Sequence, residues 1–138
     1  MQNTAESFLK VKWNKRFIYP KSVRSLQDGK RHYEVGDEKL PSVTTILGAT
    51  QSDEKRESLA RWRAKKGKNE ADRVKNEAAE RGSIMHSIIE HHVNGNNILD
   101  MTETGQGAHR MAAVIIDKGF DNLDEIWGSE VVLSYPGL

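Results

Sequence analysis

A stripe of apolar residues between positions 84 and 93 constrains the fold of this chain more than any other feature. At about 100° per residue, apolar side chains three and four positions apart gather on one face of a helix. Another element must cover that face, so the stripe predicts a helix packed along a core. His86 and Glu90 fall together just past one edge of the face, and His92 falls within it. The stripe consists of Ile84, Met85, Ile88, Ile89 and Val93.

The chain has 138 residues, a length that suits one modest domain. Its 36% apolar and 30% charged residues are typical of a globular protein with a large solvated surface. It contains no cysteine, so any metal must be held by His, Asp or Glu. No apolar run approaches the roughly 18 residues of a membrane span, and the first residues lack a signal-peptide pattern. We therefore expect a cytoplasmic protein with no membrane partner.

Charge is distributed unevenly along the chain. Residues 1–81 carry 19 Lys and Arg against 12 Asp and Glu, a net of +7. Residues 82–138 carry 2 against 8, a net of −6, which gives the overall +1. This asymmetry suits a protein that holds a polyanion with one part and cations with the other. Ordinary surface charge explains it equally well.

The first half of the chain predicts a polar leader, a hairpin and a short ambiguous segment. Residues 1–16 form the leader, and extended segments follow at 17–19 and 23–26. Asp28-Gly29 favours a tight turn, because both residues tolerate positive φ, with 31–35 as the returning strand. After a second turn over 36–39, residues 40–47 begin like a helix but are rich in strand-forming residues.

Three helices and a strand are predicted for the rest of the chain. Ser52-Asp53-Glu54 is a typical helix start, and that helix runs to about Lys66 with Gly67 as its stop. The helix carrying the apolar stripe spans about 69–93, where Gly82 either kinks it or admits a close backbone. A third helix spans about 106–118. Residues 125–135 read as a strand with two apolar faces.

His86, Glu90 and Glu130 are the candidate metal-site residues. Imidazole and carboxylate are good ligands for Mg²⁺, Mn²⁺ or Zn²⁺, and the i, i+4 spacing puts His86 and Glu90 one turn apart. The same spacing is typical of a partly buried histidine hydrogen-bonded to its neighbour. Glu130 enters the apolar strand, where a carboxylate is costly unless it is paired or bound to metal. Alternatively, it lies at the exposed start of that strand.

The helix after Ser52 is the candidate nucleic-acid surface. Clustered Lys and Arg attract phosphates, and an exposed indole can stack on an unpaired base. Alternatively, Trp62 packs in the core with Leu59. The sequence has no Gly-rich phosphate loop, no nucleophile elbow and no His-Glu-x-x-His motif. The residues that we expect to contact nucleic acid on this helix are Arg61, Trp62, Arg63, Lys65 and Lys66.

Four segments, in this order, resemble the RecB-like exonucleases of the PD-(D/E)XK superfamily. They are similar to phage-encoded members and to the mitochondrial genome maintenance exonuclease. The most specific segment has the form Arg-Gly-x-x-x-His-x-x-x-Glu. The segments are Leu40–Leu47, the helix containing Trp62, Arg81–Glu90 and Trp127–Val131.

The resemblance implies a fold, an activity and roles for individual residues. The fold would be α/β with a restriction-endonuclease-like core, and the activity would be hydrolysis of phosphodiester bonds from DNA ends with Mg²⁺ or Mn²⁺. His86 would be a metal ligand, while Glu130 and Glu90 would be the catalytic carboxylates. Arg81 and Ser83 would join the nucleic-acid contacts. The partner would be DNA, single-stranded or at its ends, together with phage recombination or replication proteins in a host cytoplasm.

The chain departs from the family pattern at its end. In the family, a Gly-x-x-Asp strand and then a strand with Asp/Glu-x-Lys would follow Leu138. The triplets beginning at Asp37 and Asp53 precede His86 and do not replace them. We therefore expect residues 17–138 to be the N-terminal part of one nuclease domain, with the hairpin, the helices and the first core strand, inactive by itself. The alternatives are a non-catalytic nucleic-acid-binding module and a structural metal-binding domain.

Overall fold

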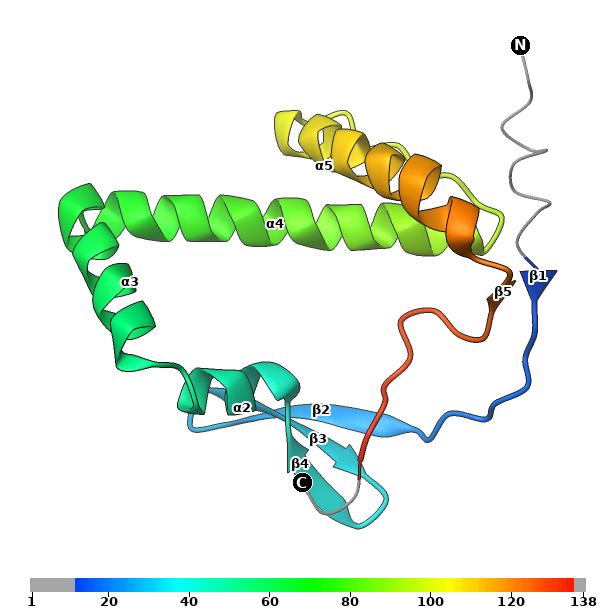
Figure 1. The fold of residues 1–138 in the computed structure, drawn as a ribbon, viewed down its shortest axis with the longest axis horizontal. Helices are drawn as coiled ribbons and strands as arrows, with labels where there is room; N and C mark the ends of the chain where they lie inside the picture. Colours follow the sequence, from blue (N-terminus) through cyan, green and yellow to red (C-terminus); the bar gives the residue numbers. More distant parts are fainter. Residues whose placement is uncertain (1–11, 136–138) are drawn as a thin grey trace. The chain divides into compact units, whose positions relative to one another are not determined.

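The structure, a computed structural model, describes residues 12–135 and contains both helices and strands (Figure 1). The predicted α/β mixture is confirmed. The described residues form four α-helices and two small sheets, one of three strands and one of two. They divide into two compact units. One unit combines the described residues up to Phe17 with Asn69–Glu130, and the other combines Ile18–Lys68 with the described residues from Val131 on.

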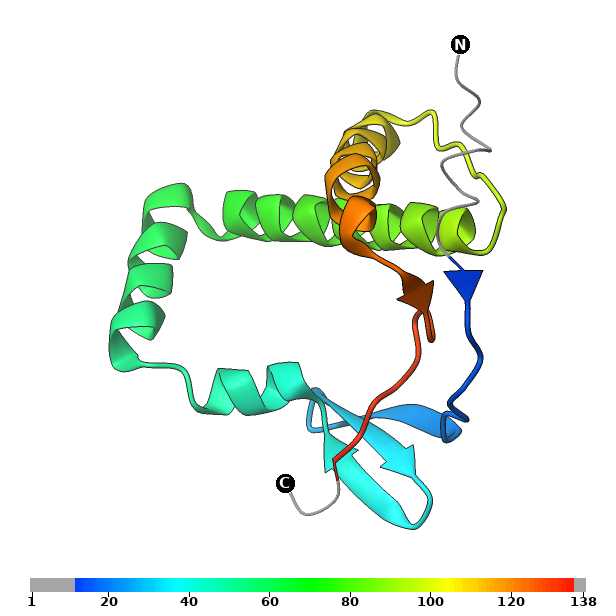
Figure 2. The ribbon, with the colours of Figure 1, turned by 45° about the vertical axis from the view of Figure 1, so that its right-hand side comes forward.

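The second unit is built on an antiparallel sheet in the order β2-β3-β4 (Figure 2). Its strands are β2 (Ser22–Gln27), β3 (Lys30–Val35) and β4 (Glu38–Pro41). Asp28 and Gly29 have φ values of 51° and 73° and make the tight turn that the sequence predicted. The predicted second turn is shorter than expected, because β4 already begins at Glu38.

Two helices follow the sheet in this unit. The ambiguous segment divides at Ser42, whose hydroxyl oxygen accepts a hydrogen bond from the Thr45 amide at 3.1 Å and caps α2 (Val43–Ala49). Helix α3 (Asp53–Lys66) has the predicted bounds, from the Ser52 cap to Gly67, where φ is 84°. None of its residues is buried. The alternative in which Trp62 and Leu59 pack in a core is therefore wrong, and Leu59 is 48% exposed.

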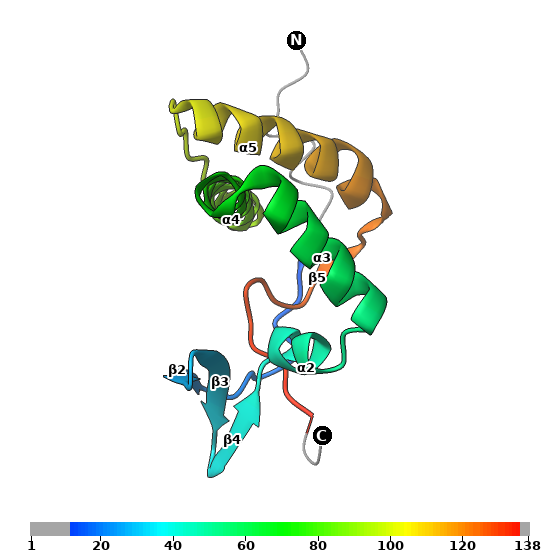
Figure 3. The same ribbon diagram turned by 90° about the vertical axis from the view of Figure 1, so that its left-hand side faces the viewer.

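The first unit is organised by α4 (Lys68–Val93) and α5 (Glu103–Val114), and Figure 3 shows α5 crossing over α4, which is seen end-on. Ile88 packs with Ala108 and Ala112 of α5, and part of the predicted stripe adds to this cluster. The stripe is thereby confirmed as the buried face of α4. The helix runs without interruption through Gly82, and a Cβ at that position would meet nothing within 4 Å. Neither role predicted for Gly82 is present.

Helix α5 begins earlier than predicted because of its cap. The Thr102 hydroxyl oxygen accepts a hydrogen bond from the Gly105 amide at 3.0 Å, and Asp100 Oδ1 accepts bonds from the Thr102 amide and hydroxyl. The helix is continued by a π-helical turn over Ile115–Gly119 and a 3₁₀ turn over Phe120–Asn122. The ring of Phe120 then lies 6.0 Å from that of His92.

The first unit also contains a short sheet of two parallel strands. Strand β1 (Lys12–Trp13) pairs with β5 (Glu125–Ile126), and the Trp13 indole N–H donates to the Val93 carbonyl at the end of α4, at 2.7 Å. Most of the predicted polar leader lies outside the described residues, but its end forms β1. The predicted strand over 125–135 is wrong beyond Ile126, because residues 127–135 have no regular structure.

No helix among residues 12–135 is both long enough and apolar enough to cross a lipid bilayer.

The surroundings of Gly105 in α5 and of Gly82 in α4 predict opposite effects of substitution by alanine. A Cβ at Gly105 would lie 2.6 Å from the Cβ of Asp100, so Gly105→Ala should lower the free energy of unfolding by about 1–3 kcal/mol. Gly82→Ala adds a Cβ in open space within a helix and should raise it by up to about 1 kcal/mol. Urea denaturation measures both changes. Equal effects would contradict the proposed close approach at Gly105.

Candidate functional site

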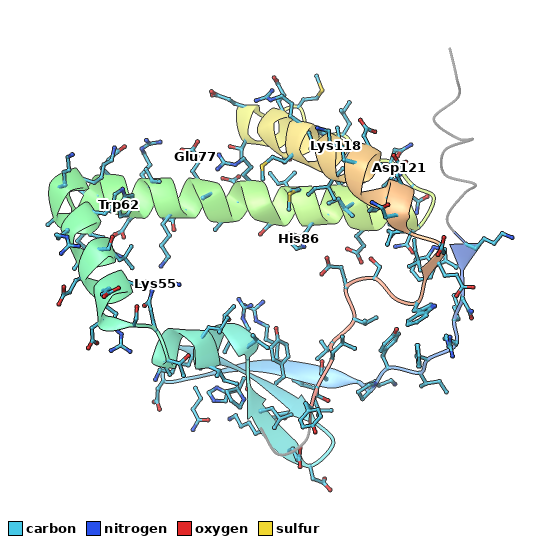
Figure 4. The ribbon with its side chains drawn as sticks, in the orientation of Figure 1. Lys55, Trp62, Glu77, His86, Lys118 and Asp121 are labelled. Atoms are coloured by element: carbon cyan, nitrogen blue, oxygen red, sulfur yellow. The ribbon has the colours of Figure 1, made fainter. Side chains whose placement is uncertain are left out.

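The C-terminal half of α4 presents a polar surface pocket on the side opposite its apolar stripe. Figure 4 shows His86 on the side of α4 that faces away from α5. This placement follows from helix geometry, because Ile88 must point to α5 and His86 lies two positions before it. Glu90 lies one turn further along the same surface, as the sequence predicted. The pocket is lined by Gly82, Ser83, His86, Ser87, Glu90 and Glu130.

His86 and Glu130 meet in this pocket although 44 positions separate them. His86 Nδ1 lies 3.3 Å from Glu130 Oε1, and the two side chains are 66% and 51% exposed. A long contact between exposed groups contributes little to folding, because water competes for both partners. The His86 imidazole and the Glu130 carboxylate are therefore both accessible to a ligand at small energetic cost.

Glu130 reaches His86 from a bend and not from a strand. The prediction of a strand-borne carboxylate is wrong, because strand β5 ends at Ile126. The backbone of Glu130 has a φ of 53°, the left-handed region that favours glycine. This conformation is less favourable for a non-glycine residue by about 1–2 kcal/mol. Such strain is common where a side chain is held for a function.

The pocket brings together two side chains of types that can bind a divalent cation, His86 and Glu130. No group of three His, Asp or Glu residues within residues 12–135 is arranged to hold a metal. His86 and Glu130 nevertheless offer one nitrogen and one carboxylate at a single point. Mg²⁺ typically keeps several waters and uses one or two carboxylates together with substrate phosphates. Mn²⁺ additionally tolerates an imidazole ligand, so either ion suits this pair.

The sequence predicted some members of this pocket and misjudged others. The hydrogen bond of His86 runs to Glu130 and not to Glu90, although Glu90 shares the pocket. Ser83 lines the pocket as well. Arg81 does not, because its Cδ lies 3.4 Å from the position of a Cβ at Gly107, on the α5 side of α4. Gly82 and Ser87 were missed, and helix periodicity from His86 could have found them.

The predicted nucleic-acid residues of α3 belong to the other unit and do not share one face. At about 100° per residue, Trp62, Arg63 and Lys66 fall within one sector of roughly 100°. Arg61 and Lys65 fall on a different sector, and the Arg61 guanidinium lies 3.9 Å from the Glu57 carboxylate. Trp62 is half-buried. Trp62 lies between the two groups of basic residues, about 60° from Lys65 on one side and about 40° from Lys66 on the other.

An aromatic cluster beside β5 was missed by the sequence analysis. The Phe17 and Trp127 ring centroids lie 5.3 Å apart, and the Arg16 guanidinium lies over both rings. The Trp127 indole N–H donates to the Glu125 carboxylate at 2.9 Å, and this bond, with one from Asn14, holds the pKa of Glu125 below its usual value. No local sequence signal links segments more than 100 positions apart.

No protein-family model, curated protein or solved structure matches this chain. Its function is therefore inferred from the chemistry of its own side chains.

The strained backbone at Glu130 gives a direct test of how this carboxylate is held. Glu130→Gly and Glu130→Ala both remove the carboxylate, but only glycine relieves the left-handed conformation. We expect the glycine variant to be more stable to unfolding by about 1 kcal/mol, as measured by urea denaturation. An alanine variant that is equally stable would show that Glu130 carries no backbone strain.

Proposed function

We propose that this chain contributes to the metal-dependent hydrolysis of DNA, as an exonuclease module of the RecB-like, PD-(D/E)XK type. The observation that carries the proposal is the approach of His86 Nδ1 to Glu130 Oε1, at 3.3 Å, in a pocket that Glu90 also lines. An imidazole, two carboxylates and two serine hydroxyls in one open pocket suit a cation and a phosphate group together. The order of the family-like segments in the sequence supports the same function.

The side chains of the pocket have distinct roles in this proposal. His86 and Glu130 would hold a Mg²⁺ or Mn²⁺ ion, which supplies Lewis-acid stabilisation of negative charge on the phosphate when it is bound. Glu90, one turn from His86, is the carboxylate that would accept the proton of an attacking water. The hydroxyls of Ser83 and Ser87 would donate hydrogen bonds to the non-bridging oxygens.

The exposure of the pocket favours a polymeric substrate. His86 and Glu130 are both more than half exposed, so a bulky phosphodiester can reach them without an opening of the fold. A pocket for a small metabolite would instead bury most of its ligand. Hard oxygen donors with a single imidazole also favour Mg²⁺ or Mn²⁺ over zinc, whose sites use more nitrogen or sulfur ligands.

Metal binding by the purified chain tests this proposal without requiring turnover. Mn²⁺ should bind the wild-type protein, as followed by its electron paramagnetic resonance signal, and His86→Ala or Glu130→Gln should weaken binding at least 10-fold. His32→Ala is the matched control, because His32 lies on β3 and hydrogen-bonds to Lys30. Undiminished Mn²⁺ binding by both pocket variants would overturn the proposed metal site.

A non-catalytic nucleic-acid-binding module is the second candidate function. It is supported by α3, which buries none of its residues and carries basic side chains around a half-buried indole. Such a surface can hold a phosphate backbone without cleaving it. This module would bind DNA equally well with and without divalent metal, whereas DNA binding at the proposed nuclease pocket would depend on Mg²⁺ or Mn²⁺.

Salt dependence measures whether α3 contacts phosphates. Lys66→Gln should reduce the slope of log affinity against log salt by about 1, because one phosphate contact is lost. Fluorescence anisotropy with a labelled oligonucleotide gives the slope. Lys118→Gln, in the π-helical turn, is the matched control and should leave it unchanged. Identical slopes for the wild-type protein and Lys66→Gln would show that Lys66 does not contact the DNA phosphates.

A further inference from the structure

Phe17, Arg16 and Trp127 form an exposed aromatic–arginine cluster in the unit that contains the pocket. The Arg16 guanidinium carbon lies 5.1 Å from the Phe17 ring centroid and 5.0 Å from that of Trp127. The two rings meet edge to face at 5.3 Å. Each aromatic residue is 46% exposed, so much of their surface is open to solvent. Aromatic residues that only fill a core would be buried far more completely.

The cluster is held in place by the paired strands β1 and β5, which lead into it. Strand pairing sets Trp13 beside Ile126, and the Asn14 amide N–H donates to the Ile126 carbonyl at 2.9 Å. The Trp127 indole is fixed further by its hydrogen bond to Glu125. The rings are thus oriented before any ligand arrives, which lowers the entropic cost of binding.

The charge around the rings favours an anionic ligand. Lys12, Lys15 and Arg16 all come from the same short exposed segment. Glu125 is the carboxylate nearest to Trp127 in sequence, and it is engaged by the indole and by the Asn14 side chain. Lys12 pairs with Glu125 across strands β1 and β5, so its charge lies beside the same carboxylate. Basic groups interleaved with open aromatic rings are typical of single-strand nucleic-acid surfaces.

We propose that Phe17 and Trp127 form a base-stacking platform for an unpaired DNA strand whose phosphates are contacted by Arg16. The platform rests on the DNA substrate of the proposed function. Trp127 lies three residues before Glu130, so their Cα atoms are at most about 11 Å apart. A stacked strand covers this distance in roughly three nucleotides. Bases inside a duplex are already stacked, so the platform selects single-stranded ends.

Oligonucleotide binding in the presence of EDTA tests the platform separately from the metal site. The probe is a fluorescein-labelled oligothymidylate of about 12 nucleotides, a length within the usual range of single-strand sites. Trp127→Leu and Phe17→Leu should each weaken binding about 5- to 150-fold, and Trp127→Phe should recover part of the loss because a phenyl ring still stacks. Tyr135→Leu is the matched control, since Tyr135 is 71% exposed and belongs to the other unit. Circular dichroism checks the fold of each variant.

The outcomes separate this platform from the proposed hydrolysis. Unchanged affinity in folded Phe17→Leu and Trp127→Leu, equal binding of a duplex of the same length, or an equal loss in Tyr135→Leu would each overturn the platform. None of these results affects Mn²⁺ binding at His86 and Glu130. Conversely, Trp127→Leu could weaken oligonucleotide binding while the wild-type chain binds no Mn²⁺. That result would support the platform and overturn the metal site.

Discussion

The packing of Ile88 on Ala108 and Ala112 is the contact on which the first unit depends. The two alanines are almost completely buried, and their small side chains allow α5 to approach α4 closely. This contact fixes the rotation of α4 about its axis. Once Ile88 faces α5, helix geometry leaves His86 and Glu90 on the solvent side. One apolar contact therefore determines which polar residues of α4 can form a pocket.

The second part of the pocket depends on the end of the same helix. The Val93 carbonyl would lack a partner within the helix, and the Trp13 indole supplies one. That hydrogen bond ties β1 to α4, and β1 in turn pairs with β5. Only three residues then lie between Ile126 and Glu130. The position of the carboxylate opposite His86 is thus set by a chain of contacts between α4, β1 and β5.

Local chemistry was sufficient to predict the elements whose causes are local. The Asp28-Gly29 turn, the Ser52 cap and the stripe on α4 each depend on residues a few positions apart. The strand expected over 125–135 failed because β-propensity describes fit to a paired, half-buried surface, and β5 finds a partner only for Glu125 and Ile126. That partner is β1, which lies at the end of the segment predicted to be a polar leader. The bend at Glu130 and the Phe17–Trp127 contact likewise depend on segments that lie far apart in the sequence.

The π-helical turn after α5 fixes the number of residues between Val114 and Phe120. A π-turn closes its hydrogen bonds over one more residue than an α-turn, so it holds a surplus residue. That surplus sets the angle at which Phe120 leaves the helix and meets the His92 ring. Removing one residue from this turn would rotate Phe120 by about 100° and draw it away. Natural variation in this segment should therefore proceed by exchange of side chains, while insertions and deletions concentrate in the loop between α4 and α5.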